Sequence, residues 1–159
     1  YVLRDLATQE GAFAYEYTGY LANIYSVETY YRSNIDMLES KKFYSLFSPN
    51  QKIYTKVKNE EPTYYAESSK VSRSQFASGS IVEGEVINSV ISRNTKIKTG
   101  SSVKHSVLFP RVKVGENATV EYAIVDKGVE IGEGVVIRGT AEDPIVVKKG
   151  QKVTEDIIR

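Results

Sequence analysis

A repeat of hydrophobic positions organises the second half of the chain. Ile97 is followed at 17-residue steps by Val114 and Ile131, and the Asn-Ser-Val-Ile motif at 88–91 returns one step later as His-Ser-Val-Leu. Within each repeat an aliphatic residue recurs about every six positions, with small, polar or glycine residues between. The 3.6-residue period of an amphipathic helix is absent from this half. The pattern therefore predicts short strands in repeating coils.

An aliphatic residue every six positions fits a prism with three short parallel faces. Each aliphatic side chain would point inward, and successive coils would stack about 4.8 Å apart. Gly100, Asn117 and Gly134 share one register, and both residue types tolerate the positive φ of a sharp corner. The sequence thus predicts a mainly β fold, a left-handed parallel β-helix of hexapeptide repeats with about five coils.

The residues before this repeat show a helical pattern instead. Five large side chains fall on one face of a helix over 27–40: Val27, Tyr30, Tyr31, Ile35 and Leu38. Ser26 precedes them as a candidate N-cap, and the alternation at 15–17 indicates a short strand. Because residues 1–40 are too few to enclose such a stripe, we expect its packing partner to lie in sequence upstream.

Residues 41–66 connect the two patterns. Prolines at 49 and 62 restrict themselves and the preceding residues to extended conformations, and 53–57 alternates apolar with polar residues. We expect an extended linker here. The chain would then consist of a small α/β unit at 1–40, this linker, and the β-helix domain at 67–159.

Composition narrows the possible functions. The 159 residues include 21 basic and 20 acidic side chains, a net charge of +1, which gives no electrostatic reason to expect nucleic acid or an acidic membrane. No cysteine and one histidine exclude disulfides and multi-histidine metal centres within one chain. No apolar stretch reaches the roughly 18 residues of a membrane span. Eleven of the 12 tyrosines lie at or before Tyr65, so the two parts pack differently.

Four motifs together carry a resemblance to a known family. They are Gly-Tyr-Leu-Ala-Asn-Ile-Tyr-Ser at 19–26, Ser-Asn-Ile-Asp-Met-Leu at 33–38, Ile-Tyr-Thr at 53–55 with Pro62, and Ile-Val-Asp-Lys at 124–127. The chain resembles the sugar-phosphate nucleotidyltransferases, and most closely the bacterial ADP-glucose pyrophosphorylase (glucose-1-phosphate adenylyltransferase) family. The resemblance implies that residues 1–40 are the C-terminal end of a nucleotidyltransferase-like domain, a remnant whose catalytic part lies upstream.

One departure from the family pattern bears on activity. Catalytic members carry an Asp that helps to hold Mg²⁺ where this chain has Asn23, a Gly at Tyr25 and a Thr at Ser26. A neutral amide is a poor ligand for a hard divalent cation. The resemblance therefore implies a non-catalytic regulatory subunit of bacterial glycogen biosynthesis, with no catalytic residue or cofactor in this part and Mg²⁺ held by a catalytic partner subunit.

Basic residues suggest where an effector would bind. Lys127 stands in a turn whose lysine, in related enzymes, contacts sugar phosphates or phosphate. The repeat register places Arg93 in the same column and Arg111 in the next, and Lys148 lies in a second basic stretch. Guanidinium and ammonium groups suit an anionic effector, although a solvated surface lysine is the ordinary alternative.

Three alternatives to a regulatory and oligomerisation role remain open. The full protein could be a catalytically active glucose-1-phosphate adenylyltransferase. The β-helix could be an acyltransferase with His105 as general base, or a purely structural assembly module. We expect a cytoplasmic protein that assembles with a catalytic ADP-glucose pyrophosphorylase subunit, with itself, or with both, and that binds neither nucleic acid nor membrane.

Overall fold

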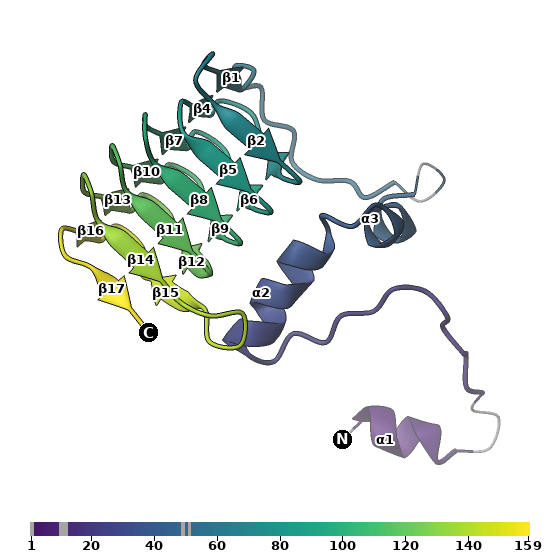
Figure 1. Ribbon diagram of the computed structural model, residues 1–159. Helices are drawn as coiled ribbons and strands as arrows, with labels where there is room; N and C mark the ends of the chain where they lie inside the picture. The colour runs from purple at the N-terminus through teal and green to yellow at the C-terminus, as the bar shows by residue number, and fades with distance from the viewer. Residues whose placement is uncertain (1, 10–12, 49, 51) are drawn as a thin grey trace.

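The computed structural model describes residues 2–9, 13–48, 50 and 52–159. Within these residues, seventeen short strands wind into a three-sided prism in which every strand pairs in parallel with its equivalent in the next coil, so that three sheets form its walls (Figure 1). The predicted parallel β-helix is confirmed, with nearly six coils in place of five. Its first strand precedes residue 67, because residues 64–65 already pair with the next coil.

The three walls are named sheets A, B and C. Sheet A consists of β1 (Tyr64–Tyr65), β4 (Ile81–Val82), β7 (Lys96–Ile97), β10 (Lys113–Val114), β13 (Glu130–Ile131) and β16 (Lys152–Val153). Sheet B consists of β2 (Lys70–Ser72), β5 (Glu85–Ile87), β8 (Ser102–Lys104), β11 (Thr119–Glu121), β14 (Val136–Arg138) and β17 (Ile157–Ile158). Sheet C consists of β3 (Gln75–Phe76), β6 (Val90–Ile91), β9 (Val107–Leu108), β12 (Ala123–Val125) and β15 (Ile145–Val147).

The interior of the prism is a stack of aliphatic side chains. In one coil Val103 comes from sheet B, Leu108 from sheet C and Val114 from sheet A, and all three are fully buried. Val103 pairs in register with Val86 on one side and Val120 on the other. Because each inward position lies on its equivalent in the next coil, the sequence repeat becomes one continuous core.

The corner between sheets A and B uses the residues that the repeat predicts. Gly100, Asn117 and Gly134 have φ values of 72°, 56° and 68°. A Cβ on Gly100 would lie 2.1 Å from the amide oxygen of Asn117 in the next coil. The asparagine side chain therefore covers the preceding glycine, and no larger residue fits at Gly100 without a shift.

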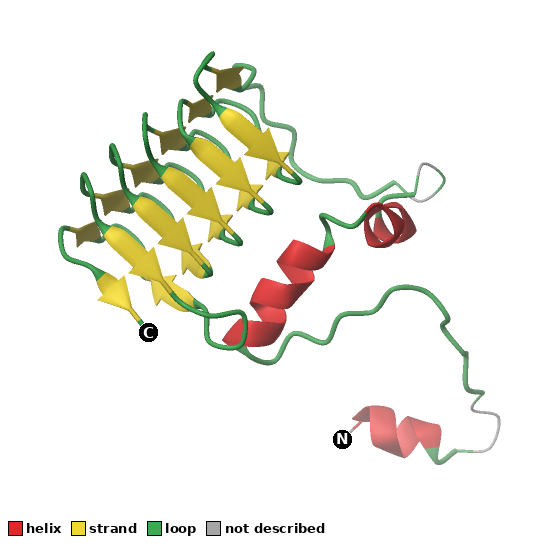
Figure 2. Cartoon of the chain, in the orientation of Figure 1, coloured by secondary structure: helices red, strands yellow, loops and turns green. Residues whose placement is uncertain are grey.

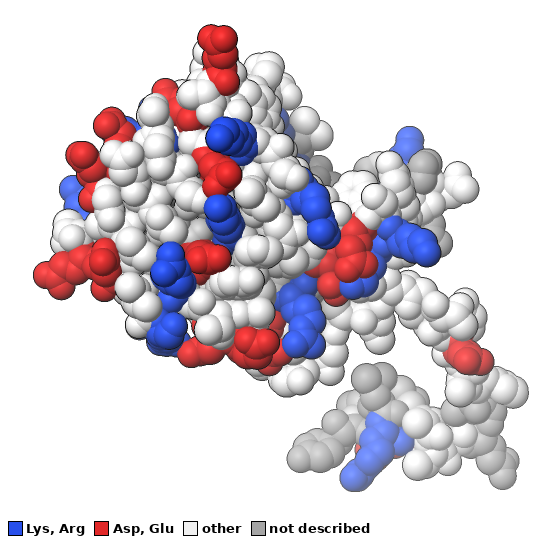
Figure 3. All heavy atoms as spheres, in the orientation of Figure 1, with Lys and Arg blue, Asp and Glu red and all other residues white. Residues whose placement is uncertain are grey.

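The outer surface of sheet B carries charges of alternating sign. The Lys104 ammonium lies 2.8 Å from the Glu85 carboxylate, and Arg138 Nε lies 3.0 Å from that of Glu121. The hydrogen bond from Lys104 holds the pKa of Glu85 below its usual value. Blue and red side chains alternate down this face in Figure 3. Each ion pair of this kind contributes little to the stability of the fold, but the alternation of sign avoids repulsion between stacked coils.

The N-terminal part differs from its predictions in three places. Residues 15–17 form no strand, because an isolated strand needs a neighbour to pair with. The helix predicted over 27–40 is α2 (Val27–Asp36) and stops early. A separate helix, α3 (Ser40–Leu46), occupies the start of the predicted linker, and α1 (Val2–Ala7) precedes both (Figure 2). Residues 52–63 form neither helix nor strand, while residues 49 and 51 lie outside the described residues.

The start of α2 follows directly from its sequence. Ser26 is the N-cap, its hydroxyl accepts a hydrogen bond from the Thr29 amide, and the Thr29 hydroxyl accepts one from the Ser26 amide in return. This reciprocal pair is a capping box. At the other end the Met37 carbonyl accepts a 2.8 Å hydrogen bond from the Gln75 side chain on β3, which ties the turn after α2 to the prism.

Replacing a core valine should cost far more than replacing an exposed one. Val103→Ala removes two methyl groups from a fully buried site, so we expect the free energy of unfolding to fall by about 2–3 kcal/mol. Val57→Ala, at a side chain that is 82% exposed, is the matched control and should change it by less than about 0.5 kcal/mol. Urea denaturation followed by circular dichroism measures both. Equal losses in the two variants would contradict the assigned core.

Candidate functional site

The outer face of sheet C is the seam between the prism and the N-terminal part. Val107 and Ile124 point outward there, yet each is at least 94% buried because α2 lies on them (Figure 1). Tyr30 of α2 stacks on Phe109, with ring centroids 6.4 Å apart. The aromatic stripe of the helix therefore packs against the β-helix of the same chain. The expectation that its partner comes from upstream sequence was wrong for this face.

Tyr31 is the buried anchor of this seam. It is 5% exposed, and its hydroxyl donates a 2.7 Å hydrogen bond to the backbone carbonyl of His105. Burial, with a smaller contribution from Tyr122, raises the pKa of the Tyr31 phenol well above its usual value. The phenol consequently stays protonated and keeps its donor role. Tyr31 thus contributes both an apolar contact and a directional hydrogen bond to the seam.

His105 lies in a corner column next to this anchor. Its backbone has a φ of 47°, as do those of Asn88 (47°) and Tyr122 (48°) in the adjoining coils. Its Nδ1 lies 2.9 Å from the Asn88 amide nitrogen, and its ring stacks on Tyr122 at 4.8 Å. Both contacts hold the imidazole within the column between neighbouring coils. This is the arrangement of a structural ladder and does not favour the acyltransferase alternative.

The residues at the predicted lost metal position lie together before α2, but they face two different hollows. Ser26 serves as the helix cap, and Tyr25 is 79% exposed and lines an apolar hollow of about 500 Å³ with Val27 and Val146. Asn23 lines a separate polar hollow of about 210 Å³ together with Asp36. The loss of the metal-holding role that catalytic family members have at these three positions stays a prediction.

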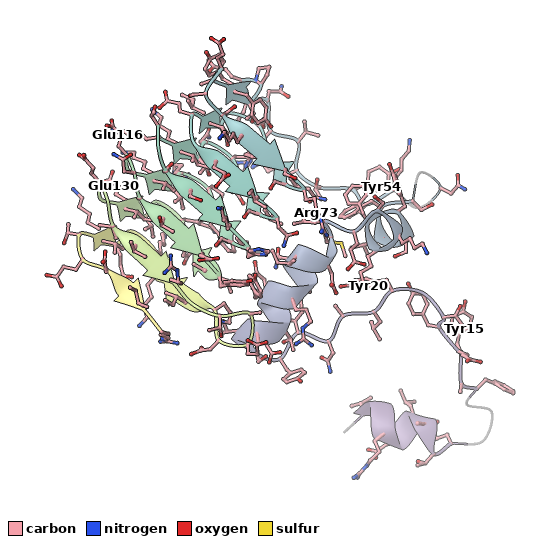
Figure 4. The ribbon with its side chains drawn as sticks, viewed as in Figure 1. Tyr15, Tyr20, Tyr54, Arg73, Glu116 and Glu130 are labelled. Atoms are coloured by element: carbon pink, nitrogen blue, oxygen red, sulfur yellow. The ribbon has the colours of Figure 1, made fainter. Side chains whose placement is uncertain are left out.

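The carboxylate of that polar hollow is already engaged. Asp36 accepts hydrogen bonds from the Tyr20 hydroxyl at 3.3 Å and the Lys42 ammonium at 2.7 Å, which joins the entry to α2, its last turn and α3. Burial and the Asp36 charge raise the pKa of Tyr20, and the hydrogen bond to Asp36 raises that of Lys42. Tyr20 belongs to the segment that precedes α2 and is labelled beside that helix in Figure 4. Within the described residues, no group of three or more potential metal ligands is assembled.

Three of the four predicted effector residues gather on one edge of the prism, where sheet C passes to sheet A. We call this the basic edge; its members are Arg111, Lys127, Lys148 and Lys149. All four are exposed. Arg93 belongs to the same column but lies 3.7 Å from Glu60 of the linker, so its charge is compensated.

Lys149 is the member that the sequence reasoning missed. Its place above Lys127 is set by the hydrogen bond from the Gly150 amide to the Lys127 carbonyl, at 3.0 Å. The 17-residue register failed here because the coil between β14 and β15 holds extra residues, including the turn at 140–143. The recurrence of Lys-Gly at 127–128 and 149–150 was the available signal.

The prism and its corners define a class. Parallel coils with an aliphatic core and turns at positive φ are the hexapeptide-repeat β-helix, and the family described as GlmU-like, C-terminal hexapeptide matches residues 56–158. The chain belongs to this family. In the part of the chain that the structure describes, none of the helices has both the length and the apolar character that a membrane crossing requires.

The chain is also similar to particular bacterial proteins. It is 41% identical over 136 residues to the glycogen biosynthesis protein GlgD of Bacillus subtilis (strain 168), which covers 86% of this chain and 40% of that protein. For GlgD of Geobacillus stearothermophilus the identity is 50% over 127 residues, covering 80% and 37%. For the glucose-1-phosphate adenylyltransferase of Clostridioides difficile (strain 630) it is 34% over 100 residues, covering 63% and 26%. The resemblance seen in the sequence is confirmed, over less than half the length of each relative.

Removing the Tyr31 hydroxyl should loosen α2 from the prism. Tyr31→Phe keeps the ring but leaves the His105 carbonyl without its donor, which should lower stability by about 1–2 kcal/mol and speed amide hydrogen exchange in α2. Tyr15→Phe, at a side chain that is 89% exposed, is the matched control. Unchanged exchange in α2 of Tyr31→Phe would show that the hydrogen bond does not hold the helix.

Proposed function

We propose that this chain is the regulatory and oligomerisation part of an ADP-glucose pyrophosphorylase-like subunit in bacterial glycogen biosynthesis. The observation that carries the proposal is its 41% and 50% identity to two proteins named for glycogen biosynthesis, over at least 80% of the chain. In the full assembly the reaction served is ATP plus glucose-1-phosphate giving ADP-glucose plus pyrophosphate. The assembly would work in the cytoplasm, where ATP and sugar phosphates are available.

The geometry supports a mechanical role for the prism. Its core is continuous from coil to coil, so a displacement at one edge is transmitted as a rigid body. The α2 seam, anchored by Tyr31, couples that body to the segment that ends at Ser26. An effector that prefers one arrangement of subunits would act through this coupling as a free energy between two sites. Mg²⁺ chemistry would belong to the catalytic partner subunit.

The basic edge is the proposed anion site. Arg111, Lys127, Lys148 and Lys149 are exposed on adjacent coils, and no carboxylate among the described residues forms an ion pair with any of their side chains. The Asp126 carboxylate accepts a 2.6 Å hydrogen bond from the backbone amide of Lys127, which shapes the turn. Four cations that have no ion-pair partner in the described part of the chain favour a multiply charged ligand such as a sugar phosphate or inorganic phosphate.

Assembly with a catalytic subunit tests the proposal. The protein in its full natural length would be co-expressed with the glucose-1-phosphate adenylyltransferase of the same organism, and pyrophosphate release would be measured with and without it. We expect the two to elute together and the effector response of the enzyme to change by about 5-fold or more. Separate elution with unchanged kinetics would overturn the regulatory assignment. Substantial turnover by the protein alone would favour the catalytic alternative.

Lys127 tests the anion site independently of assembly. Lys127→Ala should weaken phosphate binding, measured by calorimetry, by about 5-fold or more, since one charge-assisted contact is lost. Lys56→Ala removes an equal charge from the exposed linker and should leave binding unchanged. Equal affinity in the wild type and both variants would show that the basic edge is only a solvated corner.

A further inference from the structure

The outer face of sheet A carries a shallow groove of about 390 Å³. Its lining comes from β7, β10, β13 and β16, so it runs along the prism axis over four successive coils. The floor is bare backbone at Gly115 and Gly132, where a Cβ on Gly115 would lie 2.6 Å from the Gly132 backbone. Glu116 and Glu130 are labelled on this side of the prism, away from α2, in Figure 4. The groove is therefore a surface distinct from the α2 seam, and no residue of the basic edge lines it.

Ammonium and carboxylate groups are interleaved along this groove. Lys98 lies 3.4 Å from Glu116. Glu130 lies 2.6 Å from Lys113 and 3.6 Å from Lys152, and the hydrogen bond from Lys113 lowers the pKa of Glu130. An ammonium carries three N–H donors and a carboxylate has about four acceptor sites. Each ion pair therefore keeps donors and acceptors free for a ligand.

The mixture of charges selects the chemistry of that ligand. Four lysines and three glutamates line the groove, so a phosphate would meet carboxylates and a metal cation would meet ammonium groups. A hydroxyl group both donates and accepts, so it can bond to either kind of side chain. Hydrogen bonds to charged partners are also stronger than those between neutral groups. The groove thus fits an uncharged ligand that is rich in hydroxyl groups.

Tyr64 places an aromatic ring at the head of the same face. It pairs in register with Ile81, and since the neighbouring Val82 is fully buried in the core, Ile81 and Tyr64 point outward. Tyr64 is 62% exposed and lies two coils before Lys96 in sheet A. An aromatic side chain offers a broad apolar surface, which suits the C–H face of a sugar ring. The face therefore combines an apolar platform with polar groups, as ligand sites generally do.

The contacts on this face repeat from coil to coil. Successive coils are about 4.8 Å apart, a distance comparable to the length of one glucose unit in an extended α-1,4-linked chain. The four coils of the groove match about three or four such units, and the five steps from β1 to β16 span roughly 24 Å. A polymer with this repeat can make similar contacts in every coil. The periodic face thus favours a linear glycan over a single sugar.

We propose that the outer face of sheet A binds a linear α-1,4-glucan. The chain would lie along the prism axis, with its sugar rings against Tyr64 at one end and its hydroxyl groups bonded to the charged side chains of the groove. The choice of an α-glucan among hydroxyl-rich ligands rests on the proposed function, because glycogen consists of such chains. The site would hold the ADP-glucose-forming assembly on the surface of the polymer.

The glucan site and the regulatory assignment can fail separately. The glucan test uses an uncharged ligand and involves neither a catalytic subunit nor an effector. Absence of glucan binding would therefore leave the regulatory assignment intact, and failure of that assignment would leave measured glucan binding intact.

Chain length and salt provide the first test. Calorimetry on the protein in its full natural length should show maltoheptaose binding at about 1 mM, at least about 5-fold tighter than maltose, because maltose spans too few coils. Raising NaCl from 0.05 to 0.5 M should change the affinity by less than about 2-fold, since the ligand carries no charge to be screened. Co-sedimentation with glycogen would assign the site to the polymer, and maltoheptaose binding without co-sedimentation would assign it to free glucan chains.

Variants locate the site. Lys113→Ala combined with Glu130→Ala removes one ion pair from the groove and should weaken maltoheptaose binding at least about 5-fold, because charge-assisted hydrogen bonds are lost. Tyr64→Ala should weaken it by about 5-fold through loss of the ring contact. Lys104→Ala combined with Glu85→Ala removes an equivalent ion pair from sheet B. This matched control should bind maltoheptaose like the wild type.

Two further comparisons complete the test. Tyr54→Ala, at a linker side chain that is 91% exposed, is the control for Tyr64→Ala and should not change binding. The groove double variant should keep its phosphate affinity at the basic edge, which shows that its prism is folded. A wild type that does not bind maltoheptaose, equal affinity for maltose and maltoheptaose, or equal effects of the groove and sheet B variants would each overturn the proposal.

Discussion

The structure depends on the registered stacking of one coil on the next. Backbone hydrogen bonds run along the prism axis, and an inward aliphatic side chain on each face lies over its equivalent, as Val103 lies between Val86 and Val120. Each coil alone is too small to bury its apolar residues, so stability comes from contacts between neighbours. The tight corners follow from the same constraint, because a coil can close only where residues accept positive φ.

Stacking also determines what the surface can do. Because equivalent positions in successive coils are only about 4.8 Å apart, any charge repeated in the sequence becomes a column in space. Where the sign alternates, as on sheet B, the column is neutralised within the chain. Where the sign repeats, as from Lys127 to Lys149 on the basic edge, the column is not neutralised by its own stacking. The charged features of this surface are therefore columns that run along the prism axis.

The α2 seam joins this rigid body to the segment that resembles a nucleotidyltransferase. Two kinds of contact form the seam. Val107 and Ile124 provide buried apolar surface, and the Tyr31 hydroxyl provides a directional hydrogen bond. His105 contributes its backbone carbonyl to the seam, while its side chain is held between Asn88 and Tyr122. A residue that suggested catalysis in the sequence thus has a structural place in the ladder.

The sequence by itself determined the β-helix, its corners and the capped start of α2, because these depend on short-range periodicity and on residues such as Gly100 and Ser26. Only the tertiary structure decided three other features. The aromatic stripe of α2 packs on sheet C, Glu60 compensates the charge of Arg93, and Lys149 lies above Lys127. Each of these joins residues from different elements or crosses an irregular coil, and no local pattern records which distant surfaces meet.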